Sequence, residues 1–443
     1  MNISEEYMSR LCTAEEAVRL VKSGEWVDYG SGNSFPVSLD AALAQRKDEL
    51  RGVKLRGNLI PGPIMTAECD PLMEHFVYNT WHCSSYERRL CDAGRAFFSP
   101  MLFRNLSWYY REFLSVDTAM LSVSPMDDEG YFSFSGASGA VCFIADKAKK
   151  VILEVNEALP RMCGGPETKI HITRADAVVE AGFRPLWEMP VPEPAETDMK
   201  IAESILPYIH DGNVLQLGIG GIPSVLGRLI ARSELKDLGM HTELCSDAYL
   251  ELAEAGKLTN KNSLIPGKGI TGLAMGSARL YDWIRDNDAV QARDLGYVNS
   301  VNVISSVPGL ISINSCISID LYGQISSESA GLRQISGTGG QLDFVTGATA
   351  SPGGKSFICL QSCFTDKKGV SHSTIVPHFN GEIITTPRAQ AYYVATEYGA
   401  VNLAGRTTWE RADALISVAA PEFREELIRE AEKQRIWLPS NKR

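Results

Sequence analysis

Glu243 stands at the end of a short apolar pattern, Leu238–Leu244, and is followed by Ser246, Asp247 and a helical pattern from Ala248 to Gly256. A carboxylate held at a strand-to-helix turn is rigidly aimed, so it can act as a nucleophile or a base. The same carboxylate could instead only stabilise the amino end of the following helix through its dipole. The residue type and its position are therefore consistent with a catalytic role for Glu243, but they do not distinguish it from a role in helix stabilisation.

Two glycine-rich segments could bring a ligand against the backbone. In Leu217–Pro223 a strand pattern gives way to a helix, whose first N–H groups favour an anion; the candidate binding residues are Gly218, Ile219, Gly220, Gly221 and Ile222. In Ser336–Gln341, successive N–H groups could form an oxyanion site at Gly337, Gly339 and Gly340. A simple tight turn and a surface loop are the alternatives. Neither segment matches a dinucleotide or P-loop motif.

Further polar residues have a functional and a structural interpretation. Asn314 follows the strand pattern Leu310–Ile313 and could donate to a reacting oxygen or only form a turn. Lys268 could bind a phosphate or be an ordinary exposed lysine. We expect His241, on the same strand face as Glu243, to give local support. Acyl contacts are possible for Gly30–Pro36 and Trp81-His82-Cys83-Ser84, although lone His and Trp residues are more often structural.

The composition is that of an ordinary globular protein with material for a large core. The chain has 443 residues, of which 44% are hydrophobic and 22% charged, and two domains are expected at this length. Its net charge of −11 argues against nucleic acid or a membrane surface as the main partner. No apolar run reaches the roughly 18 residues that a membrane span needs, and the amino end does not resemble a signal peptide.

The ten cysteines are scattered and form no Cys-x-x-Cys pair, and the seven histidines lack zinc-site spacing. We therefore expect reduced thiols in a cytoplasmic protein, with no metal site and no disulfide framework.

The chain has two related halves. Gly24, Gly30 and Gly32 in the first have the same spacings as Gly212, Gly218 and Gly220 in the second, with a proline and a helical pattern after each. This repeat predicts an internal duplication, although chance similarity is an alternative. The segment Pro185–Glu196 holds four prolines and is the expected linker, which predicts domains 1–195 and 196–443. Alternating β-branched runs and helical patterns predict an α/β fold with parallel-rich sheets flanked by helices.

Together, the Glu243 segment and the two glycine segments resemble the acetyl-CoA hydrolase/transferase branch of the family I CoA-transferases. Within it they resemble butyryl-CoA:acetate and 4-hydroxybutyrate CoA-transferases. The resemblance runs through nearly the whole chain. Further matching pieces, in the family's order, are Ala274–Ser277, Arg279–Asp282, Ile313–Cys316, Asp320–Gln324, Ala395–Gly399 and Asn402–Arg406.

The resemblance implies two similar open α/β domains of the CoA-transferase kind and a ping-pong exchange of CoA between a short-chain acyl-CoA and acetate. It assigns Glu243 as the nucleophile, forming a γ-glutamyl-CoA thioester, with Asn314, Gly337, Gly339 and Gly340 beside it. The Gly218–Ile222 segment, Lys268 and Gly340 would contact CoA, which is a substrate; no tightly bound cofactor is expected. A homodimer is expected from the family alone. An acyl-CoA hydrolase and a non-catalytic acyl-CoA-binding or metabolite-binding protein are the alternatives.

Two segments depart from the family pattern. After Tyr297 the sequence reads Val298-Asn299-Ser300-Val301 where relatives carry Asn-Asp-Pro or Asn-His-Pro, and Ala419-Ala420-Pro421 replaces Ala-His-Pro. These departures put the acyl-chain preference and local CoA contacts in doubt.

Overall fold

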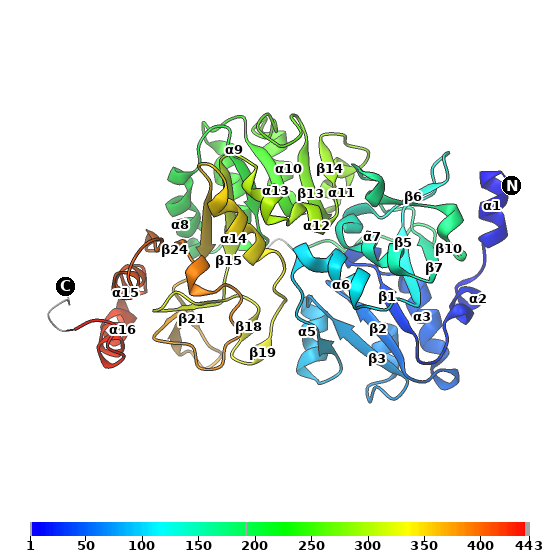
Figure 1. Ribbon diagram of the computed structural model, residues 1–443, viewed down its shortest axis with the longest axis horizontal. Coiled ribbons are helices and arrows are strands. Elements are labelled where there is room, and N and C mark those ends of the chain that lie inside the picture. Colours follow the sequence, from blue (N-terminus) through cyan, green and yellow to red (C-terminus); the bar gives the residue numbers. More distant parts are fainter. Residues whose placement is uncertain (1, 191–192, 439–443) are drawn as a thin grey trace.

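The computed structural model describes residues 2–190 and 193–438. The first half of the chain forms a seven-stranded sheet of order β10-β7-β5-β1-β2-β3-β4, and all neighbouring strands are parallel (Figure 1). Its strands are β1 Trp26–Tyr29, β2 Val53–Gly57, β3 Phe76–Thr80, β4 Phe97–Phe98, β5 Thr118–Val123, β7 Lys150–Val155 and β10 Ala177–Glu180. Its helices are α1 Ile3–Arg10, α2 Ala14–Ala17, α3 Val37–Gln45, α4 Met65–Cys69, α5 Ser85–Asp92, α6 Leu106–Glu112 and α7 Ser138–Lys147.

The second half forms a nine-stranded sheet of order β25-β24-β20-β15-β11-β12-β13-β14-β8, parallel except for the β24–β25 pair. Its strands are β11 Val214–Leu217, β12 Gly239–Cys245, β13 Gly269–Ala274, β14 Val290–Ala292, β15 Leu310–Ser315, β20 Lys355–Cys359, β24 Tyr393–Thr396 and β25 Gly399–Asn402, with β8 Cys163–Gly164 at one edge. Its helices are α8 Glu196–Ile205, α9 Gly221–Arg232, α10 Asp247–Glu254, α11 Ala278–Ile284, α12 Leu295–Val298, α13 Val301–Ser305, α14 Gln341–Ala350, α15 Thr408–Ser417 and α16 Pro421–Lys433.

The two sheets repeat one topology. When β25 and β8 are set aside, the second sheet reads β24-β20-β15-β11-β12-β13-β14, which in chain order is the same arrangement as the first. In both, a glycine turn follows the first strand: Gly30 and Gly32 come after β1, and Gly218 and Gly220 after β11. Parallel strands need crossover helices, which explains why β-branched runs alternate with helical patterns. The predicted duplicated α/β architecture is confirmed.

Local boundaries differ in places from the sequence pattern. The sequence from Ala14 to Lys22 has a helical pattern, but the helix ends at Ala17 and continues as a short 3-10 turn, Val18–Leu20. The strand β8 comes from the first half but pairs with β14 of the second sheet, so the halves share a sheet edge. Part of the proline-rich linker lies outside the described residues, and the boundary at residue 195 stays a prediction. Among the described helices, none has the length and apolarity required to cross a bilayer.

Short strands between β15 and β24 carry the second glycine segment. Here β16 Ser318–Asp320 pairs with β17 Ile325–Ser326 and β23 Ile375–Val376, and β18 Ser329–Ala330 forms a hairpin with β19 Arg333–Gln334. A further pair is formed by β21 Cys363–Thr365 and β22 Ser371–Ser373. In the first half, β6 Tyr131–Ser133 pairs with β9 Lys169–His171. The glycine segment follows β19 and leads into α14. In Figure 1, β18 and β19 lie beside α5 of the first half.

An apolar cluster joins the two halves. Trp81, Phe103 and Ala140 of the first half pack with buried side chains of the second half, among them Leu244, Leu273, Met275 and Leu295. Burying large aromatic and aliphatic side chains across the junction stabilises their association by the hydrophobic effect, at about 25 cal/mol per Å² of apolar surface. The junction therefore holds its side chains in fixed positions beside Glu243.

Candidate active site

Glu243 lies near the carboxyl end of β12, between the parallel neighbours β11 and β13. The carboxyl ends of parallel strands meet at one edge of the sheet, where open α/β folds place their ligand sites. In β12 Glu243 is the residue that keeps partial exposure, while the rest of the strand is buried. The strand thus fixes the backbone of Glu243 and leaves its side chain accessible at the sheet edge.

The accessible side of Glu243 faces a cavity of about 640 Å³. Both halves of the chain line it. The first half contributes Leu59, Pro61, His82, Cys83, Ser84, Ser85, Arg88 and Phe103, and the second half contributes residues including Gln216, Gly218, Ile219, Glu243, Asn314, Gly337, Gly339 and Gly340. Most of the predicted catalytic and binding residues are therefore brought to one cavity.

The Glu243 carboxylate has two hydrogen-bond donors. Asn299 Nδ2 lies 2.8 Å from Glu243 Oε2 and also 3.3 Å from Asp343 Oδ2, so one amide group bridges the two carboxyl groups. The backbone N–H of Gly340 donates to Glu243 as well. These contacts orient the carboxylate, because donors on fixed backbone and on a buried side chain restrict its rotation.

The pKa of Glu243 is raised to about 8, chiefly by burial and also by the negative charge of Asp343, while the Asn299 and Gly340 hydrogen bonds oppose the shift. Burial also raises the pKa of Asp343 to about 6, against the attraction of Arg104. At pH 7 the ligand-free site therefore holds an ionised Asp343 beside a largely protonated Glu243. A group with this pKa becomes a nucleophile within the physiological range, as functional carboxyl groups often do.

The glycine segment approaches Glu243 closely because it carries no side chains there. A Cβ at Gly340 would overlap Glu243 Oε2 and Asn299 Nδ2. At Gly339, φ is +57°, a conformation that side-chain-bearing residues rarely adopt. The buried Glu328 holds the segment, since Thr338 Oγ1 donates to its carboxylate at 3.2 Å. The loop therefore presents its backbone, rather than side chains, to the reacting space.

An ion pair ties this site to the first half of the chain. Arg104 Nη1 lies 2.7 Å from Oδ1 of the fully buried Asp343, and the Arg104 backbone N–H donates to Asp343 Oδ2.

Arg104→Met should lower the free energy of unfolding by about 3 kcal/mol, because it leaves a buried carboxylate without its cation. Denaturant unfolding measures this. Arg111→Met, which removes an exposed pair with Glu112, is the matched control and should change little; equal losses for the two variants would contradict the structural role of Arg104.

Asn314 and Asn299 have different places in the site. Asn314 lines the cavity, but its amide bonds Gln216 Oε1 and Ser312 Oγ, both at 3.0 Å, rather than Glu243. Asn299, which contacts Glu243, was not among the predicted site residues. It belongs to the segment that departs from the family pattern, and that departure was the available signal. His241 Nε2 donates to the Val298 carbonyl at 2.8 Å, which fits the expected role in local support.

The predicted CoA-contacting residues are only partly brought together. Gly218 and Ile219 line the cavity, and Gly220 lines an adjoining hollow of about 350 Å³, whereas Gly221 and Ile222 begin α9. Lys268 precedes β13, so it lies at the amino edge of the strands, opposite Glu243, and pairs with Asp288. The glycines on either side of Lys268 do not indicate at which edge of the sheet this lysine lies. Lys268 therefore lies outside the Glu243 site.

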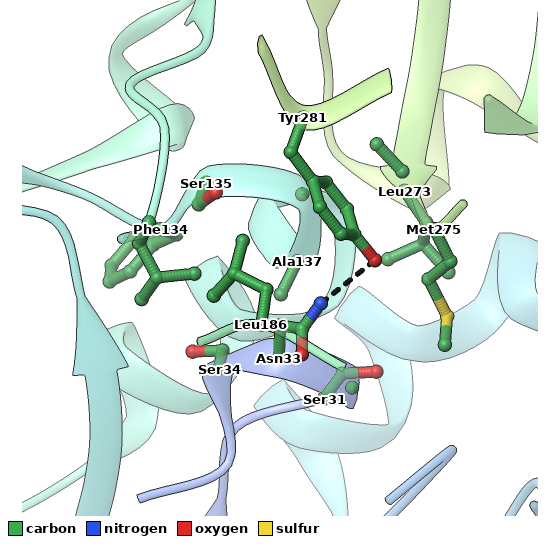
Figure 2. A pocket seen from close by; sticks show the side chains of 14 residues that line it. Ser31, Asn33, Ser34, Phe134, Ser135, Ala137, Leu186, Leu273, Met275 and Tyr281 are labelled. Atoms are coloured by element: carbon green, nitrogen blue, oxygen red, sulfur yellow. Dashed lines mark hydrogen bonds between the residues drawn. The ribbon is translucent and has the colours of Figure 1, made fainter. Parts of the chain in front are cut away.

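Residues of the Gly30–Pro36 turn surround a separate, nearly filled cavity of about 10 Å³ (Figure 2). Asn33 Nδ2 donates to Tyr281 OH at 2.9 Å, and Asn33 Oδ1 accepts from the Trp187 backbone N–H at 2.8 Å. The turn thus fastens the linker and the second half to the first. It does not line the Glu243 cavity, so the expectation of acyl contacts from this turn is not supported; His82 does line that cavity.

Comparisons with known proteins agree with this architecture. Residues 1–186 match the acetyl-CoA hydrolase/transferase N-terminal domain, and residues 276–431 match the C-terminal domain of the same name. The chain is 44% identical to butyryl-CoA:acetate CoA-transferase of Anaerostipes caccae, over 100% of both chains. It is 38% identical to 4-hydroxybutyrate coenzyme A transferase of Clostridium kluyveri, covering 98% of this chain and 100% of the relative. The crystal structure of RipA from Yersinia pestis is similar, with a TM-score of 0.91 and 33% identity over 99% of this chain and 100% of that one.

Proposed function

The chain belongs to the acetyl-CoA hydrolase/transferase family, and on that premise we propose that it exchanges coenzyme A between a short-chain acyl-CoA and acetate. It is a CoA-transferase, as its named relatives are, and butyryl-CoA is the expected donor because of the relative at 44% identity. The observation that carries the proposal is one oriented carboxylate, Glu243, enclosed in a cavity beside a bare glycine backbone.

The exchange runs in two halves. The Glu243 carboxylate attacks the thioester carbonyl of the acyl-CoA, which gives a mixed anhydride and releases CoA thiolate. The thiolate attacks the glutamyl carbonyl, so the first carboxylate leaves and a γ-glutamyl-CoA thioester remains. Acetate then attacks this thioester, and the same steps in reverse give acetyl-CoA and free Glu243. Thioester energy is kept throughout, so CoA is a substrate and no resident cofactor is needed.

The chain's own residues supply what a weak nucleophile needs. Asn299 and the Gly340 N–H hold the carboxylate, and the backbone N–H groups of the Gly337–Gly340 segment are suited to stabilise the oxyanion. Loss of one such donor typically costs about 3 to 4 kcal/mol in the barrier. Water must be excluded from the cavity during turnover, because it would hydrolyse the anhydride.

The cavity wall supports a short, uncharged acyl chain. Its lining includes the apolar side chains of Leu59, Phe103, Leu244, Leu273, Met275 and Phe344. Arg88 is the cation among the described lining residues, and its Nε already donates to the Ile335 carbonyl at 2.7 Å. An apolar wall accommodates a chain such as butyrate and penalises a second carboxylate. By family likeness we further propose a homodimer located in the cytoplasm.

Incubation of the purified protein with butyryl-CoA, with and without acetate, tests the function. Acetyl-CoA formation without net release of free thiol supports the transferase. Thiol release that does not depend on acetate would instead identify an acyl-CoA hydrolase. Tight binding without turnover or covalent adduct would identify a binding protein. Borohydride reduction after incubation with acyl-CoA traps the glutamyl-CoA thioester only in the transferase.

The rate should rise with pH, because only ionised Glu243 can attack. Since the pKa of Glu243 is raised to about 8, kcat/KM for butyryl-CoA should increase through that region and level off above it. Asp343→Asn removes the like charge and should move the midpoint to lower pH. A profile already flat from pH 6 to 9 in the wild type would contradict the protonated resting state.

A further inference from the structure

His82 comes from the first half of the chain, between β3 and α5, and lies at the glycine segment of the second half. Its backbone is held on both sides: the Leu59 N–H donates to the His82 carbonyl at 2.9 Å, and the Cys83 N–H donates to the Ser336 carbonyl at 3.4 Å. Fixed backbone on each side limits where the imidazole can go. The backbone of His82 is therefore fixed beside the glycine segment.

The imidazole packs on the glycine segment. A Cβ built at Gly337 would lie 2.9 Å from His82 Nδ1, and one at Gly339 would lie 3.2 Å from His82 Cε1. The same Gly339 position is 3.6 Å from Glu243 Oε1, so the imidazole and the carboxylate flank one glycine. Phe103 packs against the ring, with centroids 5.4 Å apart. His82 is thus placed beside the space where the reacting carbonyl must lie.

One nitrogen of the ring is unsatisfied by the protein. Nδ1 is buried and has no hydrogen-bond partner among residues 2–190 and 193–438, whereas Nε2 is not among the buried atoms that lack a partner. Burial lowers the pKa of His82 to about 4, so the ring is neutral and carries one N–H donor. A buried polar nitrogen without a partner costs about 1–3 kcal/mol, and such an atom in a native structure calls for an explanation, of which a bound ligand is one.

We propose that the His82 imidazole donates a hydrogen bond to the carbonyl oxygen of the bound acyl thioester. It is then a catalytic residue that supplements the backbone donors of the glycine segment, and it makes the oxyanion site a product of both halves of the chain. The proton stays on the imidazole and no bond is broken, so the group acts as a neutral electrophile. This inference rests on the proposed CoA-transferase function.

A general-base role does not fit the surroundings of the ring. A general-base imidazole would need to donate a hydrogen bond to a carboxylate that orients it and stabilises its charged form, but the Glu243 carboxylate accepts from Asn299 and Gly340 instead. The acidic and basic residues that line the same cavity as His82, among the described residues, are Glu243 and Arg88, and Asp343 lies beyond Asn299. These surroundings favour a neutral His82 imidazole that acts as a hydrogen-bond donor.

The test compares three substitutions at one position. His82→Phe keeps an aromatic ring but removes the donor, and it should lower kcat for butyryl-CoA about 10²-fold while raising KM to a smaller extent. His82→Gln restores an N–H near the Nε2 position and should recover much of that loss. His372→Phe, the same change at an exposed histidine, is the matched control and should leave activity unchanged.

Binding to the Glu243→Gln variant separates a carbonyl contact from packing. In that background, His82→Phe should weaken butyryl-CoA but leave unchanged the affinity for S-butyl-CoA, a thioether without a carbonyl. Equal weakening of both ligands, or a kcat within threefold of wild type, would overturn the proposal. So would loss of the rise in kcat/KM near pH 8 in His82→Phe, since His82 would then be the titrating group. If the wild-type protein shows no exchange, the failure belongs to the proposed function and not to His82.

Discussion

Replacement of Glu243 by glutamine is expected to lower the rate of CoA exchange by at least about 10⁴-fold, the scale of loss when a catalytic nucleophile is removed. Glutamine keeps the size of the side chain and can still accept from Asn299 and Gly340, but a neutral amide does not attack a thioester. Steady-state exchange between butyryl-CoA and acetate measures the loss. Intact-protein mass spectrometry should show the CoA adduct in the wild type and not in the variant.

The same variant should be more stable than the wild type at pH 8. Because the folded pKa of Glu243 is raised above its unfolded value, folding is favoured at low pH and loses this contribution as pH rises toward about 8. Glutamine does not titrate, so the difference in Tm should widen from about pH 4.5 to pH 8. Equal Tm values across this range would mean that Glu243 is not enclosed as described. Activity within tenfold of wild type would remove it from the mechanism.

Replacement of Gly340 by alanine is expected to reduce exchange by about 10²-fold to 10³-fold, in the range for loss of one oxyanion-site donor. The added Cβ would overlap Oε2 of Glu243 and Nδ2 of Asn299, so the carboxylate must leave its oriented position. A misplacement of about 1 Å at a reacting group costs on this scale. The effect should fall mainly on kcat, as the cavity walls that hold the acyl chain are unchanged.

Backbone strain does not explain the expected loss at Gly340. Its φ is −104°, which alanine adopts readily. Circular dichroism and CoA affinity should therefore remain close to wild type, and these are the controls. If Gly340→Ala retained more than a third of the wild-type kcat, the carboxylate would have another productive position, and the role given to its hydrogen bonds would be wrong.

The active site depends on the junction of two repeated sheets. One sheet supplies the carboxylate, Asn299 and the glycine segment, and the other supplies cavity wall, His82 and the Arg104 partner of Asp343. The ion pair spans 239 positions in the chain, and the turn around Asn33 fastens the same junction elsewhere. The two sheets thus have the same topology but contribute different residues to the site.

Several features followed from the sequence alone. Alternating β-branched and helical patterns predicted the parallel-rich α/β sheets, because side-chain periodicity reflects which face of an element is buried. The equal glycine spacings predicted the duplication, as each turn needs residues without side chains after its first strand. The ordered motifs around Glu243 gave the family. These signals are local, or repeat locally, so one sequence is enough to find them.

Tertiary structure decided which residues reach Glu243. Asn299 lies 56 residues from Glu243 and became its partner only through the packing of α12 and α13 against the sheet. Lys268 sits in a promising local pattern, yet strand direction sends it to the opposite edge. The raised pKa of Glu243 also arises from burial between two halves of the chain. Strand order, sheet edge and desolvation depend on contacts between distant segments, and local spacing does not encode them.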